Sequence, residues 1–359
     1  MEVKRRTRRA VRIQDVAERA LVSIGTASRV MNNHPNVEAA LRLRVLDAAK
    51  MLGYVHRARP AGAEPPGASE GAPGPERKLD HIAFCCRSGV SPRVAPEFNP
   101  YFSLVLQGAE AECRRQGLHL SYRIIEDDVS ELPRANEMLN RSQADALLLL
   151  NFIDHELVRG LVQTGLPAVL VDHYFPDLAL DAVMNDSYQG AFQAVQYLVA
   201  QGHRRIAFID GLNHSTIERR YDGYRRALSR AGLPFDPAWV LPGNLRAEGG
   251  QMAAQEFLRR RLECSAAFCA NDETAFGFMQ TMTREGRRVP DDISVVGFDD
   301  VETARYLSPP LTTVRANAPA LGQLAVRKLL ERMANPDLPV TQTLVHAELI
   351  ERLSVRRLP

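Results

Sequence analysis

The stretch IQDVAERALVSIGTASRVMNN, residues 13–33, decides how the N-terminal part of this chain folds. Val16 and Ala20 lie about one helical turn apart and predict one face of a short helix. Ser23 follows at the position of an N-cap, which predicts a second helix from about Ile24 to Met31. Two short helices joined by such a tight turn form a helix-turn-helix.

A third helix is predicted over about residues 37–52, where apolar residues recur at helical spacing. Residues 1–59, which include the run KRRTRR (4–9), contain thirteen Lys and Arg against five Asp and Glu, a net charge of +8. The rest of the chain has a net charge of −6. We therefore expect this end to bind a polyanion such as DNA. A three-helix bundle that docks on protein, with Ser and Thr only as helix caps, is the alternative that the pattern leaves open.

The second helix carries the residues expected to contact DNA, because Ala27 and Val30 face the core of the unit. Its outer face is expected to hold Ile24, Gly25, Ser28 and Arg29. The positive end of the helix, near Ser23 and Thr26, favours a phosphate. Arg29 is expected to read a base edge, most naturally as a bidentate contact with guanine that provides about 1 to 3 kcal/mol of discrimination.

Composition limits the rest of the molecule. A length of 359 residues predicts two or three domains, at about 100 to 200 residues each. The cysteines show no CxxC spacing and no neighbouring His cluster, which argues against a zinc site or a disulfide framework and favours a reducing compartment. They are Cys85, Cys86, Cys113, Cys264 and Cys269. No apolar run approaches the roughly 18 residues of a membrane span, and no apolar signal segment follows the charged N-terminus. We expect a cytoplasmic protein that has neither cofactor nor metal and does not enter a membrane.

Residues 58–78, ARPAGAEPPGASEGAPGPERK, contain five Pro, four Gly and five Ala with almost no apolar bulk. Such a segment cannot offset the entropy that ordering its backbone would cost. We predict a flexible linker here, between a DNA-binding domain at 1–57 and an effector-binding and dimerisation domain at 79–359.

The second domain alternates short apolar runs with amphipathic stretches. Strands are predicted at 82–86, 119–125, 146–150, 168–171, 205–210, 266–270 and 293–298. Helices are predicted to begin near Ser103, Ser130 and Asp154 and to cover 187–201, 218–231, 248–262 and 272–286. This alternation predicts parallel sheets joined by right-handed crossovers, in two lobes. Ligands of such sheets bind beyond the carboxyl ends of the strands.

The chain resembles the lac/galactose repressor (LacI/GalR) family over nearly its whole length. In the head the resemblance rests on residues 13–33 and on RVLDAAKMLGY (44–54). In the body it rests on AVLVD (168–172), GHRRIAFIDG (202–211), RYDGYRRAL (220–228), CANDETAFG (269–277), VPDDISVVGFDD (289–300) and PPLTTV (309–314).

The resemblance implies an all-α helix-turn-helix head followed by an α/β body of two doubly wound parallel-sheet lobes, similar to periplasmic binding proteins. The chain is expected to cross between the lobes three times. Lobe 1 would comprise about 79–182 and 315–340, and lobe 2 about 183–314 and 341–359.

The resemblance also implies site residues. In the head it assigns base reading to Ile24, Gly25 and Arg29, and phosphate contacts to Ser23, Thr26, Ser28 and Asn32. In the cleft between the lobes it assigns ligand binding to Asp172, Arg220, Asn271 and Asp299, with Asn99, Tyr101 and Phe102 as lining residues. Carboxylates, an amide and an Arg can bind several hydroxyls at once, while an aromatic ring stacks on a sugar face.

Several of these residues have structural alternatives. Asn271 and Asp299 can also be turn formers. Arg219 competes with Arg220, and only the R-x-x-G spacing favours Arg220. Asp272 and Asp300 are expected to be helix caps or turn residues and not ligands.

Among the departures from the family pattern, two concern the turn of the head and the linker. Leu21 stands where the family usually has Gly in the turn, and a non-Gly residue forced to positive φ costs roughly 1 to 2 kcal/mol. The Pro-rich and Gly-rich linker replaces a short hinge helix whose Leu wedges into the minor groove, so no hinge helix is expected.

The expected function is a cytoplasmic, homodimeric transcription regulator, a repressor, that binds a double-stranded DNA operator. A small polar effector, expected to be a sugar, would bind between the lobes and control it. Phe276, Met279 and Met282 are candidates for an apolar dimer face. A solute-binding or sugar-sensing protein without operator-specific repression is the alternative, and it would need no basic head. An enzyme is disfavoured because GxGxxG, P-loop, GxSxG and HExxH patterns are absent.

Overall fold

The computed structural model describes residues 13–31, 39–52, 79–88, 100–211 and 214–359. The predicted linker at 58–78, the run KRRTRR, Asn32 and Asn99 lie outside these residues. The chain divides into two compact units, Met1–Glu76 and Arg77–Pro359, and each has its own apolar core.

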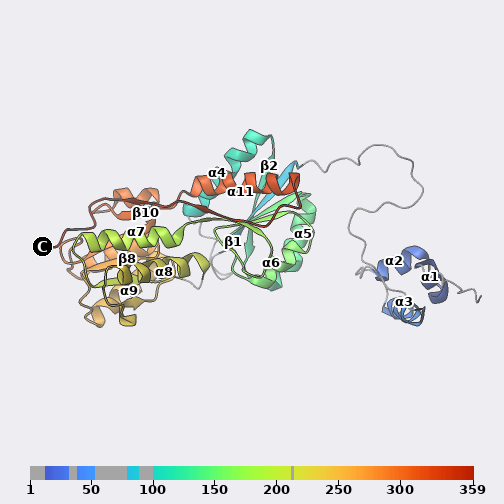
Figure 1. The fold of residues 1–359 in the computed structure, drawn as a ribbon, viewed down its shortest axis with the longest axis horizontal. Coiled ribbons are helices and arrows are strands. Elements are labelled where there is room, and N and C mark those ends of the chain that lie inside the picture. Colours follow the sequence, from blue (N-terminus) through green and yellow to red (C-terminus); the bar gives the residue numbers. More distant parts are fainter. Residues whose placement is uncertain (1–12, 32–38, 53–78, 89–99, 212–213) are drawn as a thin grey trace, which may run out of the picture. The chain divides into compact units, whose positions relative to one another are not determined.

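The first unit, the head, contains helices α1 (Ile13–Ala20), α2 (Ile24–Met31) and α3 (Ala39–Leu52). This confirms the predicted helix-turn-helix and the third helix that completes it (Figure 1). Small side chains at helical spacing fill the core: Val16, Ala17, Ala20, Ala27, Val30, Val45, Ala48 and Ala49. Because most of them are Ala and Val, the three helices can approach closely around a core of little volume.

The turn between α1 and α2 is held by backbone and side-chain hydrogen bonds. The Val22 N–H donates to the Ala17 carbonyl at 3.0 Å, and the Arg44 guanidinium donates to the Ala20 carbonyl at 2.6 Å. Leu21 adopts φ of 50°, the left-handed conformation that Gly adopts without steric cost, and its side chain is 83% exposed. Ser23 caps α2, since its Oγ accepts the Thr26 N–H at 3.1 Å, as predicted.

The second unit, the body, contains two six-stranded sheets. The first sheet has the order β11-β5-β4-β3-β1-β2, with all its pairs parallel. Its strands are β1 (His81–Ser88), β2 (His119–Glu126), β3 (Ala146–Leu150), β4 (Ala168–Val171), β5 (Asp181–Asn185) and β11 (Gln342–Val345). The helices α4 (Pro100–Gln116), α5 (Leu132–Ser142), α6 (His155–Val162) and α11 (Ala318–Ala334) belong to this lobe (Figure 1).

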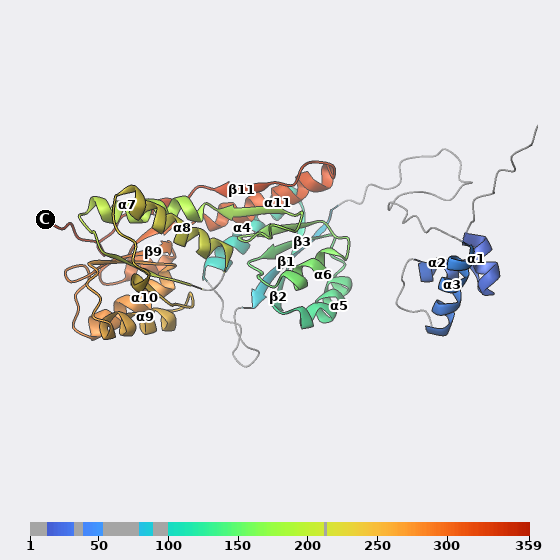
Figure 2. The same cartoon turned by 60° about the horizontal axis from the view of Figure 1, so that its bottom comes forward.

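The second sheet has the order β12-β10-β9-β8-β6-β7, with β12 antiparallel to β10. Its strands are β6 (Ile206–Ile209), β7 (Val240–Leu241), β8 (Ala266–Cys269), β9 (Ser294–Asp299), β10 (Thr312–Arg315) and β12 (Glu348–Ile350). The helices α7 (Ser187–Ala200), α8 (Ser215–Arg230), α9 (Ala247–Arg259) and α10 (Asp272–Arg284) belong to this lobe (Figure 2). The parallel α/β architecture predicted for the body is thereby confirmed.

Side chains alternate between the two faces of each sheet along its strands, and helices cover both faces, so both faces are buried. In the first sheet, Phe84 and Leu148 pack in a core shared with α4 and α11, while Cys85 and Leu149 pack in a core shared with α5 and α6. The second sheet repeats this arrangement with α7 and α8 on one face and α9 and α10 on the other. The apolar runs without polar alternation in the sequence follow from this two-sided burial.

Strands β5 and β11 lie in the first sheet, so that sheet reaches residue 185 and includes residues 342–345. Both stretches lie beyond the lobe boundaries at about 182 and 340 expected from the sequence. They join at the edge because β11 pairs parallel to β5 over Gln342–Val345. The chain then returns to the second sheet through β12.

The suggested dimer face on helix α10 is wrong for two of its residues. Met279 and Met282 are buried in the core between α10, α9 and the second sheet, and Phe276 packs partly buried against the same core. Helices α9 and α10 approach so closely that a Cβ at Gly277 would lie 1.8 Å from the Ala247 carbonyl oxygen. The apolar stripe of α10 therefore serves the lobe itself.

All five cysteines are buried and unpaired. Burial raises the pKa of Cys85 to about 12, so the group is a neutral thiol packed in the sheet. Within the described part of the chain, none of the helices has the length and apolar character that crossing a bilayer requires.

Candidate functional site

Polar side chains gather where the carboxyl ends of the two sheets meet. We call this group the sheet junction, and it consists of Tyr101, Asp172, Asn185, Arg220 and Asp299. Asp172 directly follows β4, Asn185 ends β5 and Asp299 ends β9. Tyr101 lies in the first turn of α4, and Arg220 lies in α8. The junction thus draws on both lobes, as expected for ligands of parallel sheets.

On the side of the first sheet, Asp172 is 4% exposed. Its Oδ1 has no hydrogen-bond partner in the described part of the chain, and the same holds for Asn185 Oδ1. The Asn185 amide donates to Tyr101 Oη at 2.6 Å. Burial raises the pKa of Asp172 to about 6, although the charge of Arg220 and hydrogen bonds from Tyr101 and Asn185 act in the opposite direction.

On the side of the second sheet, Arg220 is 4% exposed and held at three points. It donates to the Ala270 carbonyl at 2.5 Å and to Asp299 Oδ1 at 3.3 Å, and its guanidinium lies 3.7 Å from the centre of the Phe298 ring. Burial raises the pKa of Asp299 to about 7, with Arg220 opposing the shift and Asp172 adding to it. The Arg220 guanidinium can donate hydrogen bonds to a polyhydroxy ligand, and the carboxylates of Asp172 and Asp299 can accept hydrogen bonds from its hydroxyls.

Both carboxylates are presented by a backbone that only glycine adopts freely. Asp172 has φ of 59° and Asp299 has φ of 112°. Such conformations cost on the order of 1 to 3 kcal/mol in a non-Gly residue and concentrate at functional sites. The chain keeps a side chain at both positions, which favours a role for the carboxylates.

The other expected ligand-binding residues take different positions. Asn271 caps α10, because its Oδ1 accepts the Thr274 N–H at 3.0 Å and its amide donates to the Leu245 carbonyl at 3.0 Å. Phe102 packs partly buried against the core beside Tyr101. Arg219 pairs with Asp186 at 3.6 Å and is more exposed than Arg220, so the R-x-x-G spacing selected the buried arginine.

Sequence reasoning missed several polar residues next to the junction. His173 follows Asp172, and its Nδ1 lies 2.7 Å from the Ser215 hydroxyl, which links the first lobe to α8. The rings of His173 and His214 lie 4.5 Å apart. Arg87, at the end of β1, acts electrostatically on both histidines. The signal for His173 was available, because it follows the strand AVLV and Asp172 directly.

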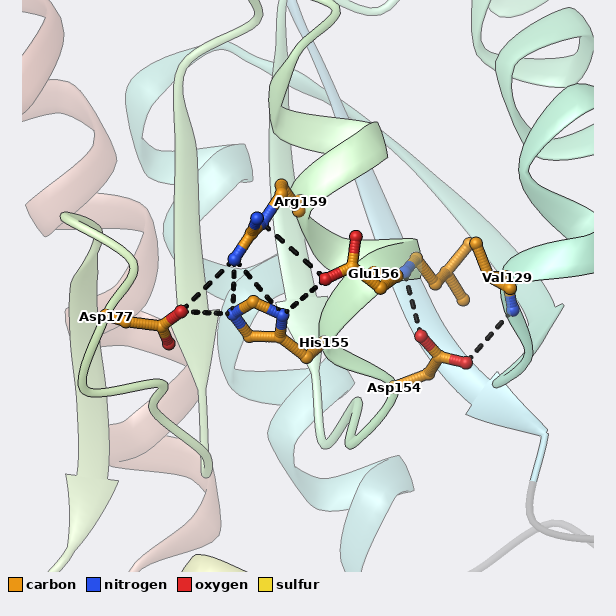
Figure 3. Close-up of polar contacts among 7 residues, drawn as sticks. Val129, Asp154, His155, Glu156, Arg159 and Asp177 are labelled. Atoms are coloured by element: carbon orange, nitrogen blue, oxygen red, sulfur yellow. Dashed lines mark hydrogen bonds and ion pairs between the residues drawn. The ribbon is translucent and has the colours of Figure 1, made fainter.

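The segment from β4 to β5 that carries Asp172 and His173 is fastened to helix α6. Figure 3 shows Asp177 beside His155 and Arg159, at 2.8 and 3.2 Å. Asp154 caps α6 through the Leu157 N–H and also accepts the Val129 N–H at 3.0 Å. Phe175 packs edge-on against both His155 and His173. These contacts fix the loop that presents the junction residues.

In the head, Ser23 is exposed at the start of α2 and Thr26 is half-buried one turn later, with 2.9 Å between their hydroxyl oxygens. Ile24, Gly25, Ser28 and Arg29 lie in α2, but their side chains are not among those described. The hydroxyls of Ser23 and Thr26 thus lie together at the N-terminal end of α2.

Two family models match the chain. Residues 12–56 match the model described as "Bacterial regulatory proteins, lacI family", and residues 195–355 match the model "Periplasmic binding protein-like domain". The HTH-type transcriptional repressor PurR of Mannheimia succiniciproducens is 31% identical over 96% of this chain and 99% of its own length. The ribose operon repressor of Haemophilus influenzae is 31% identical over 90% of this chain and 92% of its own length.

Solved structures give the same picture. The complex of the transcriptional regulator CelR with cellobiose superposes with a TM-score of 0.71 at 28% identity, covering 96% of this chain and 99% of the other. The lac repressor dimer bound to operator and the anti-inducer ONPF superposes with a TM-score of 0.67 at 26% identity, covering 97% of this chain and 100% of the other. Both similarities extend over head and body.

Proposed function

The chain belongs to the LacI family of bacterial regulatory proteins, and on this premise we propose that it is a homodimeric repressor whose release from its operator is controlled by a sugar bound at the sheet junction. It is a DNA-binding regulator and not an enzyme. Residues 1–57 would bind DNA, 58–78 would be a linker, and 79–359 would bind effector and partner. The proposed site of action is the cytoplasm, where the DNA is.

The observation that carries the effector proposal is the buried group of Tyr101, Asp172, Arg220 and Asp299. Such burial of charged groups is costly unless something else satisfies them. Asp172 Oδ1 and Arg220 Nε lack partners in the described residues, so a ligand with several hydroxyls supplies the missing hydrogen bonds. Related structures carry bound cellobiose and ribose, which supports a sugar as the ligand class.

The effector can control DNA binding only if it prefers one arrangement of the two lobes. Asp172 and Arg220 belong to different lobes, and a ligand that contacts both favours the arrangement that keeps them together. In the head, Arg29 is proposed to read a base while Ser23, Thr26, Ser28 and Asn32 contact phosphates, with Ile24 and Gly25 facing the groove.

The DNA part is tested by fluorescence anisotropy of the full chain on duplexes from its own promoter region and on shuffled duplexes of equal length. At about 150 mM salt we expect a specific affinity at least a hundredfold above the non-specific one. Arg29→Ala should lose about tenfold or more. Arg205→Ala, which removes the same charge from an exposed site in the body, serves as control. Equal binding to both duplexes would reject the proposal.

The effector part is tested by thermal melting of the full chain with a panel of sugars, since a ligand of the native state raises the midpoint. The sugar that raises it should also release the operator. Arg220→Ala should abolish both effects while leaving operator affinity in the absence of sugar unchanged. A sugar response that survives Arg220→Ala would exclude the sheet junction as the site.

A further inference from the structure

We infer that the effector carries a negatively charged group, and that Arg87, His173 and His214 bind this group beside the sheet junction. The inference deepens the proposed function and rests on it, because it takes the sheet junction to be the effector site. The effector class is then an anionic sugar, either a sugar acid or a sugar phosphate.

Arg87 is a buried cation whose hydrogen bonds are incomplete. Its side chain is 10% exposed, and the Asp127 carboxylate lies 3.7 Å away. The Asp127 oxygens already accept the backbone N–H groups of Ile153 and Asp154, both at 2.9 Å. Arg87 Nε has no partner in the described part of the chain. A buried guanidinium with a spare N–H and a distant, shared counter-ion is suited to accept an anion.

His214 offers a second spare donor from the other lobe. Its Nδ1 accepts the Thr216 N–H at 3.3 Å and lies 2.7 Å from the Thr216 hydroxyl, which can donate to the same nitrogen; in this tautomer the neutral ring carries its proton on Nε2. Nε2 is buried and, among the described residues, has no hydrogen-bond partner. The ring packs 4.5 Å from that of His173, whose Nδ1 bonds to Ser215. The two histidines, one from each lobe, therefore lie side by side, and Arg87 acts electrostatically on both.

The charges of this group favour an anion. Burial, together with the positive charge of Arg87, lowers the pKa of His173 to about 4. Burial lowers the pKa of His214 as well, with His173, Arg87 and Arg220 adding to the effect. Asp127 is the carboxylate that pairs with Arg87 here. A bound anion would offset the charge of Arg87 and allow an imidazole to take up a proton.

The buried atoms without partners in the described residues include both donors and acceptors. On the junction side, Asp172 Oδ1, Asn185 Oδ1 and Asn151 Oδ1 are acceptors, and Arg220 Nε is a donor. On the Arg87 side they are donors, Arg87 Nε and His214 Nε2. A sugar whose hydroxyls form hydrogen bonds with the first set and whose carboxylate or phosphate accepts from the second set satisfies both. A neutral sugar leaves Arg87 with its ion pair to Asp127 at 3.7 Å and adds no charge to it.

The test is calorimetric titration of the full-length protein with matched ligands. The neutral sugars are D-glucose, D-galactose and D-ribose, and the anions are D-glucuronate, D-galacturonate, D-ribonate and the 6- or 5-phosphates of the three sugars. We expect one anion to bind at least tenfold more tightly than its neutral counterpart. The acid arm and the phosphate arm distinguish the two sources of charge.

Substitutions at Arg87 test whether this residue causes the preference for an anionic over a neutral sugar. Arg87→Gln should reduce the affinity for the anion to that for the neutral sugar, and Arg87→Lys, which keeps the charge, should retain part of the preference. Arg205→Gln removes a charge from an arginine that is 54% exposed and should change nothing. At pH 6, titrations in two buffers of different ionisation enthalpy should show more proton uptake with a sugar acid than with the matching neutral sugar.

A neutral sugar that binds as tightly as its anions, with Arg87→Gln equal to wild type, overturns the inference and leaves the proposed function intact. Binding by no member of the panel overturns the sugar effector itself and this inference with it. The operator-binding test is independent of both results.

Discussion

The two sheets of the body share one strand order but differ at the ends where their ligands would bind. Their first five strands run β2-β1-β3-β4-β5 and β7-β6-β8-β9-β10, so each strand of one sheet has a counterpart in the other. Beyond β4 the chain places Asp172 at φ of 59°, and beyond β9 it places Asp300 at φ of 56°. Equivalent positions thus carry the same residue type in the same unusual backbone conformation.

Their hydrogen bonds are opposite in character. In the second sheet, Asp272 accepts the Val301 N–H at 2.9 Å and the Thr313 hydroxyl at 2.5 Å, and Asp300 pairs with Arg315 and Arg352. In the first sheet, Asn151 and Asp172 each keep an oxygen without a partner in the described residues. The carboxylates of Asp272 and Asp300 therefore have partners within the second lobe, whereas Asn151 and Asp172 of the first sheet each keep an oxygen for a ligand.

The largest expected loss of stability follows from removing the Asp272 carboxylate of the second lobe. Asp272→Ala leaves two buried donors without an acceptor, and each costs about 1 to 3 kcal/mol. We expect the free energy of unfolding of the body to fall by about 3 kcal/mol in urea denaturation followed by circular dichroism. Asn151→Gly, after the corresponding strand of the first sheet, removes an oxygen without a partner at a position whose φ of 62° Gly adopts freely, and should cost less than about 1 kcal/mol. Equal losses in the two variants would show that the sheets do not differ as described.

At Asp172, replacing the carboxylate is expected to raise the free energy of unfolding of the body, not to lower it. Its folded-state pKa of about 6 lies above the ordinary value of 3.8, so ionisation penalises the folded state above about pH 6, and the penalty disappears as the pH falls toward 4. Asp172→Asn should therefore stabilise the body by about 2 kcal/mol at pH 8, and hardly at all at pH 4. The same substitution should lower the affinity for the effector. Asn also tolerates positive φ.

The matched control is Asp300→Asn, which gives up ion pairs with Arg315 and Arg352 and should destabilise at pH 8. Denaturation curves at the two pH values measure both variants. If Asp172→Asn were destabilising at pH 8, the carboxylate would be a structural partner and not an unsatisfied ligand group.

The same difference explains what the sequence could predict. Runs such as ALLLL are buried on both faces, so β3 was predicted with its observed bounds. β5 (DAVMN) and β12 (ELI) begin with a charged residue, and β7 has two residues, so no apolar run marked them. Asp172, Arg220 and Asp299 could be found because each sits in a local motif.

The histidine group could not be found in this way. His173 and Ser215 are 42 residues apart in the sequence and meet only because the two lobes meet. Met279 and Met282 were misplaced for a related reason, since a helical stripe shows that one face is apolar and does not show whether a neighbouring helix or a second chain covers it. Periodicity reports burial, and contacts across lobes depend on the assembled fold.

The smallest expected effect is a change in the stability of the head at Leu21, a residue with positive φ outside the proposed effector site. Leu21 in the head has φ of 50°, which is positive as at Asp172. Its backbone forms a turn, and its side chain is exposed. Leu21→Gly removes a steric cost of roughly 1 to 2 kcal/mol and adds up to about 1 kcal/mol of backbone entropy loss, so the head should gain about 0.5 to 1 kcal/mol. Hydrogen exchange of the Val22 amide, which bonds to Ala17, should slow by a few-fold in the full chain. Leu21→Ala keeps the strained backbone and should show no such gain.

Operator affinity should be unchanged in Leu21→Gly. Asp172→Gly, which also relieves backbone strain, should lose its affinity for the effector. If exchange in Leu21→Gly became faster instead, the turn would owe its conformation to the leucine side chain.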